Sequence, residues 1–184
     1  EIASCLVGSE MCIRDRGNGM KHLLDANTLI EAKNRYYGMK ICPGYWSWLV
    51  LQNQAFELAS IVPVKDELTR GRDELADWAK DNPVLFHDIS DAPTQHAFAQ
   101  LVEAIAPLSA AMKVGALDEF LSGADPWLIA KAMSTGATVV THEVLNLEVK
   151  RKFIIPNICR MFDVPYMNTF ELLTSLRAEF VLSA

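Results

Sequence analysis

The sequence predicts an α/β fold, a three-layer α/β/α sandwich with a mainly parallel central sheet. Short apolar runs recur along the chain and alternate with longer stretches whose apolar residues have helical spacing. Short strands made of apolar residues are typical of a sheet that is buried on both faces. Their alternation with helices predicts a parallel sheet covered by helices on both sides.

The first half of the chain predicts two strands and four helices. The strands are 22–24 and 61–62, and the helices are 27–36, one that opens at Pro43, 64–70 and 73–80. Pro43 suits the start of a helix because proline is tolerated at the first helical position. In the last of these helices, Leu75, Trp78 and Ala79 form an apolar stripe.

The second half keeps the same alternation. The strands are 84–86, 138–141 and 164–167, and the helices are 93–105, 126–133, one after Pro156 and one opened by Asn168. The run 138–141 is the clearest strand, since all its residues are β-branched. Asn168 and Glu171 have the spacing of a capping box, which marks the start of the final helix.

A single domain is expected over residues 20–184. Residues 1–19 have neither a helical nor a strand period, and they resemble a spurious translated tail of the kind that adapter sequence produces. We therefore expect residues 1–19 to be non-native and Met20 to be the natural start. No internal repeat or long linker divides the chain after Met20, and the length of this part suits one core.

Composition indicates a cytoplasmic protein without a membrane segment. No apolar run approaches the roughly 20 residues needed to cross a bilayer. Cys42 and Cys159 lack the CxxC or CxxH spacing of zinc sites, so both are expected to be reduced thiols in the core. The net charge of −6 is unfavourable for binding phosphate through basic side chains, but it is compatible with an acidic metal site.

Four acidic residues stand where an apolar element runs into a loop or a helix start: Asp25, Glu67, Asp125 and Glu143. Asp25 follows one predicted strand directly, and Glu143 comes shortly after another. Ligands of open parallel sheets collect at the carboxyl ends of the strands, so both side chains are expected in one crevice. Four carboxylates without clustered cysteine or histidine predict an all-oxygen site for Mg²⁺ or Mn²⁺.

Most of these carboxylates, taken alone, also have a structural interpretation. Asp125 stands before Pro126 and is well placed to be a helix N-cap. Glu67 would then be a charge on a solvated helix face, and Glu143 a residue of a surface loop. Asp25 is the exception, because a carboxylate at the end of a buried strand is costly unless it is paired or bound to a cation.

Further residues near these positions are candidates for supporting roles. Lys150, Arg151 and Lys152 form a dense basic run, which would either hold a nucleic-acid backbone or be a solvated loop. The aromatic residues of 36–48 would stack on bases or, as we favour, pack in the core or at a dimer interface. His87 and His142 could carry protons, although no motif distinguishes them from ordinary polar residues.

The pattern as a whole resembles the PIN-domain family, metal-dependent ribonucleases that include the VapC-type toxins of toxin–antitoxin modules. The likeness extends over residues 20–176 and is specific at four places. These are the strand that ends at Asp25 with Asn27 two residues on, the pair Glu67 and Leu68, the segment 125–130, and the strand that leads through Thr141 to Glu143. At this last position glutamate replaces the aspartate that is usual in the family.

The resemblance implies a ribonuclease that hydrolyses phosphodiester bonds with Mg²⁺ or Mn²⁺. The four carboxylates named above would be its catalytic and metal-binding residues. Asn27 and Thr141 would orient the carboxylates or the substrate phosphate, and the basic run 150–152 would bind RNA. An antitoxin protein and a second copy of the chain, in a homodimer, are its expected partners.

Two other functions stay open at this point. Residues 24–29 partly match the DxDGT opening of haloacid-dehalogenase-type phosphatases, but Asn27 replaces the second aspartate and no GDxxxD follows. A non-catalytic member of the same fold, acting as a protein-interaction module, is the other alternative. The glutamate at position 143 and the acidic net charge favour this module, whereas the intact carboxylates favour the nuclease.

Overall fold

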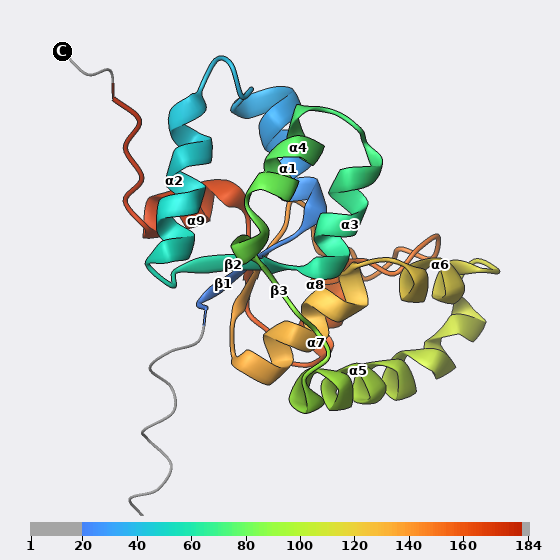
Figure 1. Ribbon diagram of the computed structural model, residues 1–184. Coiled ribbons are helices and arrows are strands. Elements are labelled where there is room, and N and C mark those ends of the chain that lie inside the picture. The colour runs from blue at the N-terminus through green and yellow to red at the C-terminus, as the bar shows by residue number, and fades with distance from the viewer. Residues whose placement is uncertain (1–19, 182–184) are drawn as a thin grey trace, which may run out of the picture.

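A parallel sheet with helices on both faces forms the centre of the molecule (Figure 1). The computed structural model describes residues 20–181. The sheet has five strands in the order β3-β2-β1-β4-β5, and every neighbouring pair is parallel. The prediction of a three-layer α/β/α sandwich with a parallel sheet is therefore confirmed. The expectation that residues 1–19 are a non-native tail lies outside the described residues.

The strands are short, and the central ones lie deep in the molecule. They are β1 (His22–Leu24), β2 (Leu58–Ile61), β3 (Phe86–His87), β4 (Thr138–Val140) and β5 (Tyr166–Met167). Every residue of β1 and β2 is buried. β1 is the central strand between β2 and β4, and Leu24 pairs with Val140 at the carboxyl ends. The residues that follow β1 and β4 therefore start from adjacent positions.

Helices connect the strands and cover the sheet. In chain order they are α1 (Ala26–Glu31), which continues into a π-helical turn (Ala32–Tyr36), α2 (Pro43–Gln54), α3 (Val62–Arg70), α4 (Glu74–Asp81), α5 (Ala92–Ile105), α6 (Ala116–Ser122), α7 (Asp125–Thr135), α8 (Ile155–Met161) and α9 (Thr169–Ser175). In Figure 1, α1, α2 and α9 lie on one side of the sheet, and α5 and α7, which pack against each other, lie on the other. No helix of the described residues is long and apolar enough to cross a membrane.

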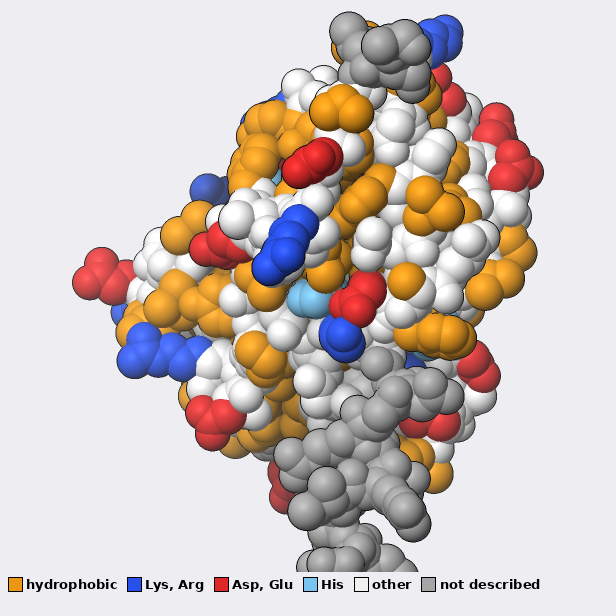
Figure 2. Space-filling view, turned by 90° about the vertical axis from the view of Figure 1, so that its left-hand side faces the viewer, with side chains coloured by type: hydrophobic (Ala, Val, Ile, Leu, Met, Phe, Trp, Pro, Cys, Tyr) orange, Lys and Arg blue, Asp and Glu red, His pale blue; other side chains and the backbone are white. Residues whose placement is uncertain are grey.

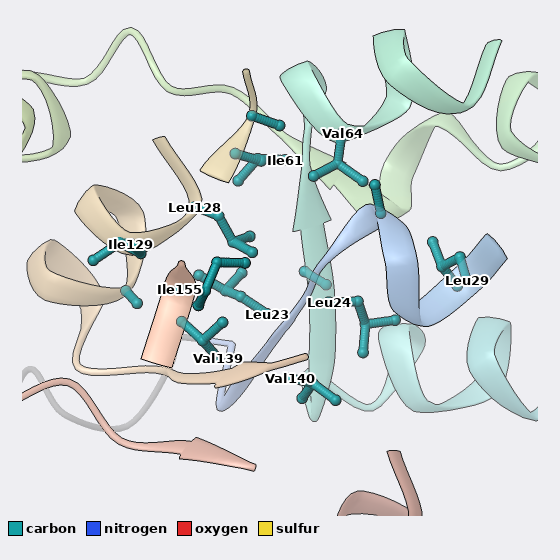
Figure 3. Packing of buried hydrophobic residues seen from close by; sticks show 14 of the residues in the cluster. Leu23, Leu24, Leu29, Ile61, Val64, Leu128, Ile129, Val139, Val140 and Ile155 are labelled. Atoms are coloured by element: carbon teal, nitrogen blue, oxygen red, sulfur yellow. The ribbon is translucent and has the colours of Figure 1, made fainter. Parts of the chain in front are cut away.

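Figure 3 shows how the two faces of the central strands are packed. Successive residues of a strand point to opposite faces of the sheet. Leu23 and Val139 accordingly lie on the side of Ile155, whereas Leu24 lies on the side of Leu29, and none of these side chains is more than 1% exposed. Apolar packing thus covers both faces of the central strands.

Two strand positions and one helix differ from the sequence prediction. The strand predicted at 61–62 lies mostly earlier, at β2, because Pro63 favours a helix start and Val62 already belongs to α3. The strand predicted at 84–86 is mostly a 3-10 turn that begins at Pro83, so β3 starts late. The sequence also does not predict the short helix α6. These shifts leave the strand order and the parallel pairing unchanged.

The face that carries α2 and α9 exposes hydrophobic side chains in patches between polar and charged ones (Figure 2). Leu51 of α2 is 60% exposed, and Phe170 of α9 is 46% exposed. Exposed apolar side chains are common on protein surfaces and do not by themselves indicate an interface. The expected homodimer therefore stays a prediction.

Candidate functional site

Asp25 lies at the carboxyl end of β1 and is the N-cap residue of α1. It is 1% exposed. The backbone N–H of Asn27 donates to its Oδ1 at 3.4 Å, and the hydroxyl of Thr141 donates to its Oδ2 at 3.0 Å. Thr141 follows β4, so the pairing of β1 with β4 brings the two side chains together. Thr141 is therefore placed to orient this carboxylate, whereas Asn27 contacts it through the backbone.

Burial makes the Asp25 carboxylate difficult to ionise. It raises the pKa of Asp25 from 3.8 to about 6, because the charged form loses its hydration. The hydrogen bonds from Thr141 and Asn27 act in the opposite direction and lower this pKa. The negative charges of Glu143 and Glu67 act in the same direction as burial. At neutral pH the carboxylate thus carries a charge that its surroundings disfavour.

Glu67 projects from α3 towards the start of α7. Its Oε1 accepts a hydrogen bond from the backbone N–H of Ala124 at 2.8 Å. Ala124 is the N-cap residue of α7, where backbone N–H groups lack partners within the helix. Glu67 therefore fastens the start of α7 to α3. The interpretation of Glu67 as a freely solvated helix charge is wrong.

Asp125 is the first residue of α7. The N-cap position belongs to Ala124, so the interpretation of Asp125 as the N-cap is wrong. The pKa of Asp125 is raised from 3.8 to about 7, mainly by burial and also by the charges of Asp25, Glu143 and Glu67. The positive charge of Lys152 opposes this rise without cancelling it. Asp125 is thus a second carboxylate whose charge is only partly compensated.

Glu143 lies in the loop after β4, and both of its carboxylate oxygens are engaged. Oε2 accepts a hydrogen bond at 2.8 Å from the backbone N–H of Ile155, the first residue of α8. Oε1 forms an ion pair with Lys152. The backbone N–H of Glu143 donates to the Thr141 hydroxyl at 3.2 Å, so this hydroxyl links Glu143 to Asp25. Glu143 is therefore tied to its surroundings more firmly than a surface loop residue would be.

A cavity of about 200 Å³ opens beside these carboxylates. Asn27, Glu67 and Asp125 line it from three different helices, and Lys152 lines it from the loop before α8. A space of this size holds several water molecules. The short helix α6 contributes Glu119 and two further residues to the lining. This contribution was not predicted from the sequence, because α6 has neither a clear apolar period nor a capping motif.

The donor chemistry of the site fits a hard divalent cation, but the side chains are not gathered into a coordination sphere. Within residues 20–181, no three Asp, Glu, His or Cys residues are placed so that they could hold one ion. The pKa of Asp125 is nevertheless raised by the charges of Asp25, Glu143 and Glu67. A divalent cation would relieve this repulsion, and carboxylate oxygens are its preferred ligands. That Asp25, Glu67 and Asp125 bind such a cation stays a prediction.

The predicted basic run divides between the site and the surface. All three residues are exposed, but Lys152 lines the cavity and pairs with Glu143, whereas Lys150 and Arg151 do not line it. The carbonyl of Lys150 accepts a hydrogen bond from the N–H of Lys113 at 2.7 Å, which fixes the loop beside the segment before α6. Lys152 is therefore the member of the run that is placed to meet a ligand inside the cavity. RNA binding by Lys150 and Arg151 stays a prediction.

Aromatic residues near the site divide into a packed set and an exposed set. Tyr45 and Trp46 are buried, as the sequence reasoning favoured. Tyr36 is 46% exposed, and its ring centroid lies 6.0 Å from that of His142 and 5.2 Å from that of Phe170. Phe170 comes from α9, and no motif in the sequence connects it with Tyr36. The folding of the chain alone brings this aromatic group together.

A family model matches most of this chain, and two solved structures are similar to it. The family model described as "Domain of unknown function (DUF4411)" matches residues 22–180. No curated protein matches the chain at a significant level. Among solved structures, the chain is similar to VapBC2 from Rickettsia felis bound to a DNA fragment from their promoter, with a TM-score of 0.48 and 17% identity over 81% of this chain and 98% of that chain. It is also similar to VapBC-1 from nontypeable Haemophilus influenzae, with a TM-score of 0.47 and 12% identity over 81% and 98% of the two chains.

Proposed function

The chain belongs to the family described as a domain of unknown function, DUF4411, and we propose that it is a metal-dependent nuclease that hydrolyses RNA. The proposal starts from the carboxylates at the carboxyl ends of β1 and β4. This edge of the sheet is where ligands of open parallel sheets bind. The reaction class is hydrolysis of a phosphodiester bond, because carboxylate-bound divalent cations support that chemistry.

The observation that carries the proposal is the raised pKa of Asp25 and Asp125, two carboxylates from opposite halves of the chain. A carboxylate with a purely structural role usually has a partner that lowers its pKa. Asp91 is such a case, since its pKa falls to about 2 against the effect of burial because Lys131 and Thr94 donate to it. Carboxylates with raised pKa values beside a cavity are typical of functional sites.

In this proposal, Asp25, Glu67 and Asp125 hold Mg²⁺ or Mn²⁺. Glu143 is the fourth carboxylate of the site, and it is paired with Lys152. The cation would activate the attacking water and neutralise the charge that develops on the scissile phosphate. Thr141 orients the Asp25 carboxylate through its hydroxyl. The backbone at the start of α7 does the same for Glu67. These contacts hold the ligands in place before a cation arrives.

The proposal includes a substrate class, partners and a location that rest on the resemblance to VapC-type toxins. RNA would enter the cavity beside Asn27, and Lys150 and Arg151 would hold its backbone on the exposed loop. An antitoxin protein and a homodimer are the proposed partners, in the cytoplasm. A short open reading frame next to the gene would favour the toxin role, and its absence would favour RNA processing.

Cleavage of a mixed RNA pool by the full chain tests the proposal. We expect cleavage with Mg²⁺ or Mn²⁺, no cleavage with EDTA, and no cleavage by the Asp25→Asn variant, which keeps the shape of the side chain but removes its charge. The variant Asp118→Asn, which changes an exposed residue of α6, is the matched control and should cut normally. Cleavage that continues in EDTA or in Asp25→Asn would contradict the proposal. A single-stranded DNA pool in parallel decides whether DNA is also cut.

A non-catalytic interaction module is the second candidate. The ion pair between Glu143 and Lys152 favours it, because it neutralises one of the four carboxylates without any metal. On this alternative, the RNA pool stays uncut with every metal, and calorimetry detects no Mn²⁺ binding. The two candidates are therefore separated by the same set of samples.

A further inference from the structure

Lys152 is the cationic side chain that lines the carboxylate cavity, and within residues 20–181 no other Lys or Arg does so. Its ammonium group pairs with Oε1 of Glu143. This pairing raises the pKa of Lys152, burial opposes the rise, and the charges of Asp125 and Asp25 add to it. The lysine is therefore positively charged at neutral pH. Its side chain is 55% exposed, so it reaches the cavity from the surface.

The carboxylate of Glu143 holds two neighbouring groups in place. One oxygen accepts the N–H of Ile155, and the other oxygen pairs with Lys152. Among the described residues, the carboxylates that line the cavity are Glu67, Glu119 and Asp125, and neither Asp25 nor Glu143 is in the lining. What sets Glu143 apart is that both of its carboxylate oxygens are engaged, so they join the loop after β4 to the start of α8 and to the lysine.

We infer that Lys152 is the second cation of this site, held there by the positioning residue Glu143, and that the site takes a single divalent ion. The inference rests on the proposed nuclease function and adds the roles of these two residues to it. Glu143 and Lys152 form a neutral pair, which leaves Asp25, Glu67 and Asp125 for the metal. A second divalent ion would have to displace the lysine against the attraction of Glu143.

A lysine ammonium can supply part of what a second metal ion supplies. In two-metal sites, the ions together neutralise the charge of the reacting phosphate and hold its oxygens. Lysine offers three N–H donors on a flexible stem and binds phosphate as a point charge. Lys152 would exchange its contact with Glu143 for a phosphate oxygen of the substrate. This step exchanges one charge-assisted hydrogen bond for another and breaks no covalent bond.

Two matched variants of the full chain, Lys152→Met and Lys80→Met, test the inference. Each removes the charge of a lysine that is 55% exposed and paired with a carboxylate, but Lys80 does not line the cavity. Calorimetric titration with Mn²⁺, without RNA, should give one ion per wild-type chain. Lys152→Met should bind Mn²⁺ roughly tenfold more tightly because a competing positive charge is gone. At saturating Mn²⁺ it should cut RNA at least about tenfold more slowly, since a group that contacts the phosphate is lost. Lys80→Met should match the wild type in both measurements.

A double variant, Glu143→Gln with Lys152→Met, separates a positioning role of Glu143 from metal ligation. It removes a neutral pair, and the glutamine oxygen can still accept the N–H of Ile155. If Glu143 is no ligand, the affinity for Mn²⁺ should stay within about threefold of the wild type, because the net charge of the site is unchanged. A loss of more than about tenfold relative to the wild type would identify Glu143 as a ligand and overturn its assigned role.

The remaining outcomes are equally decisive. Two Mn²⁺ ions per wild-type chain, or weaker Mn²⁺ binding by Lys152→Met, would overturn the inference while the nuclease proposal stands. Full cleavage by Lys152→Met would do the same. A wild-type chain that neither binds Mn²⁺ nor cuts RNA would overturn the inference together with the proposed function. Because the lysine is half exposed, the variants should fold, and their circular dichroism spectra should overlay that of the wild type.

Discussion

Replacing Asp25 by asparagine should stabilise the metal-free protein at neutral pH, although it removes a proposed catalytic group. Burial raises the pKa of Asp25 to about 6 in the folded protein, against an ordinary value of 3.8. Below pH 3.8 the carboxyl group is protonated in both the folded and the unfolded chain. Between the two values the folded state holds the proton more tightly, so stability falls as the pH rises. Above pH 6 the ionised group weakens the fold by a constant amount.

The difference between the two pKa values gives the size of this effect. Roughly two pKa units, at about 1.4 kcal/mol each, correspond to roughly 3 kcal/mol of unfolding free energy. Asp25 is 1% exposed, so solvent screening reduces this figure little. Asparagine carries no charge and still has an oxygen for the N–H of Asn27. The variant should also lower the pKa of Asp125, because the charge of Asp25 is one cause of its rise.

Urea unfolding in EDTA, from about pH 4.5 to about pH 7.5, checks the prediction. The wild type should lose stability over this range relative to Asp25→Asn, and the gap should approach roughly 3 kcal/mol at the upper end. Comparing the two proteins at each pH cancels groups that titrate in both, such as His87, whose pKa is lowered by burial. The exposed control Asp118→Asn should follow the wild type. A gap that does not change with pH, or a variant less stable than the wild type at about pH 7.5, would refute the reasoning.

Three further predictions concern the same region. Thr141→Val removes the hydroxyl that donates to Asp25, so it should cost about 1–2 kcal/mol in urea unfolding. It should also shift the acidic limb of the pH–rate profile for cleavage upward, since that hydrogen bond lowers the pKa of Asp25; an unmoved limb would contradict this. Glu67→Gln keeps an acceptor for the backbone at the start of α7, so stability should change by less than about 1 kcal/mol while Mn²⁺ affinity falls about tenfold or more. Unchanged affinity would remove Glu67 from the ligands. Leu24→Ala should cost about 2–5 kcal/mol in unfolding, with the exposed Leu51→Ala as a near-neutral control, and a smaller cost would mean that the strand end is loosely packed.

The elements that the sequence predicted best are those with a local signal. The β-branched run of β4 and the capping box of Asn168 and Glu171 are both present in the structure. β2 was placed too late because Ala59 and Ser60 have little preference for strands. Pairing with β1, and a hydrogen bond of 2.6 Å from the Ser60 hydroxyl to the carbonyl of Leu24, hold them in the sheet.

The candidate site could be predicted in part. Asp25 stood out because a carboxylate directly after a buried strand has few ways to avoid the cost of burial. For Asp125 and Glu67, the sequence alone left a cap or a solvated charge as alternatives. The structure excludes both alternatives, because Ala124 is the N-cap of α7 in place of Asp125 and donates its N–H to Glu67. No feature of the sequence indicated that Lys152 would line the cavity while Lys150 and Arg151 would not.

The sequence by itself determined the order of strands and helices and the placement of acidic residues at their ends. Apolar spacing, β-branching and caps act within a few residues, so they can be recognised along the chain. Only the tertiary structure decided which carboxylates keep a disfavoured charge and which one is paired with a lysine. That balance depends on burial and on contacts such as the one between Asp25 and Thr141, 116 residues apart, which exist only once parallel strands have brought distant segments together.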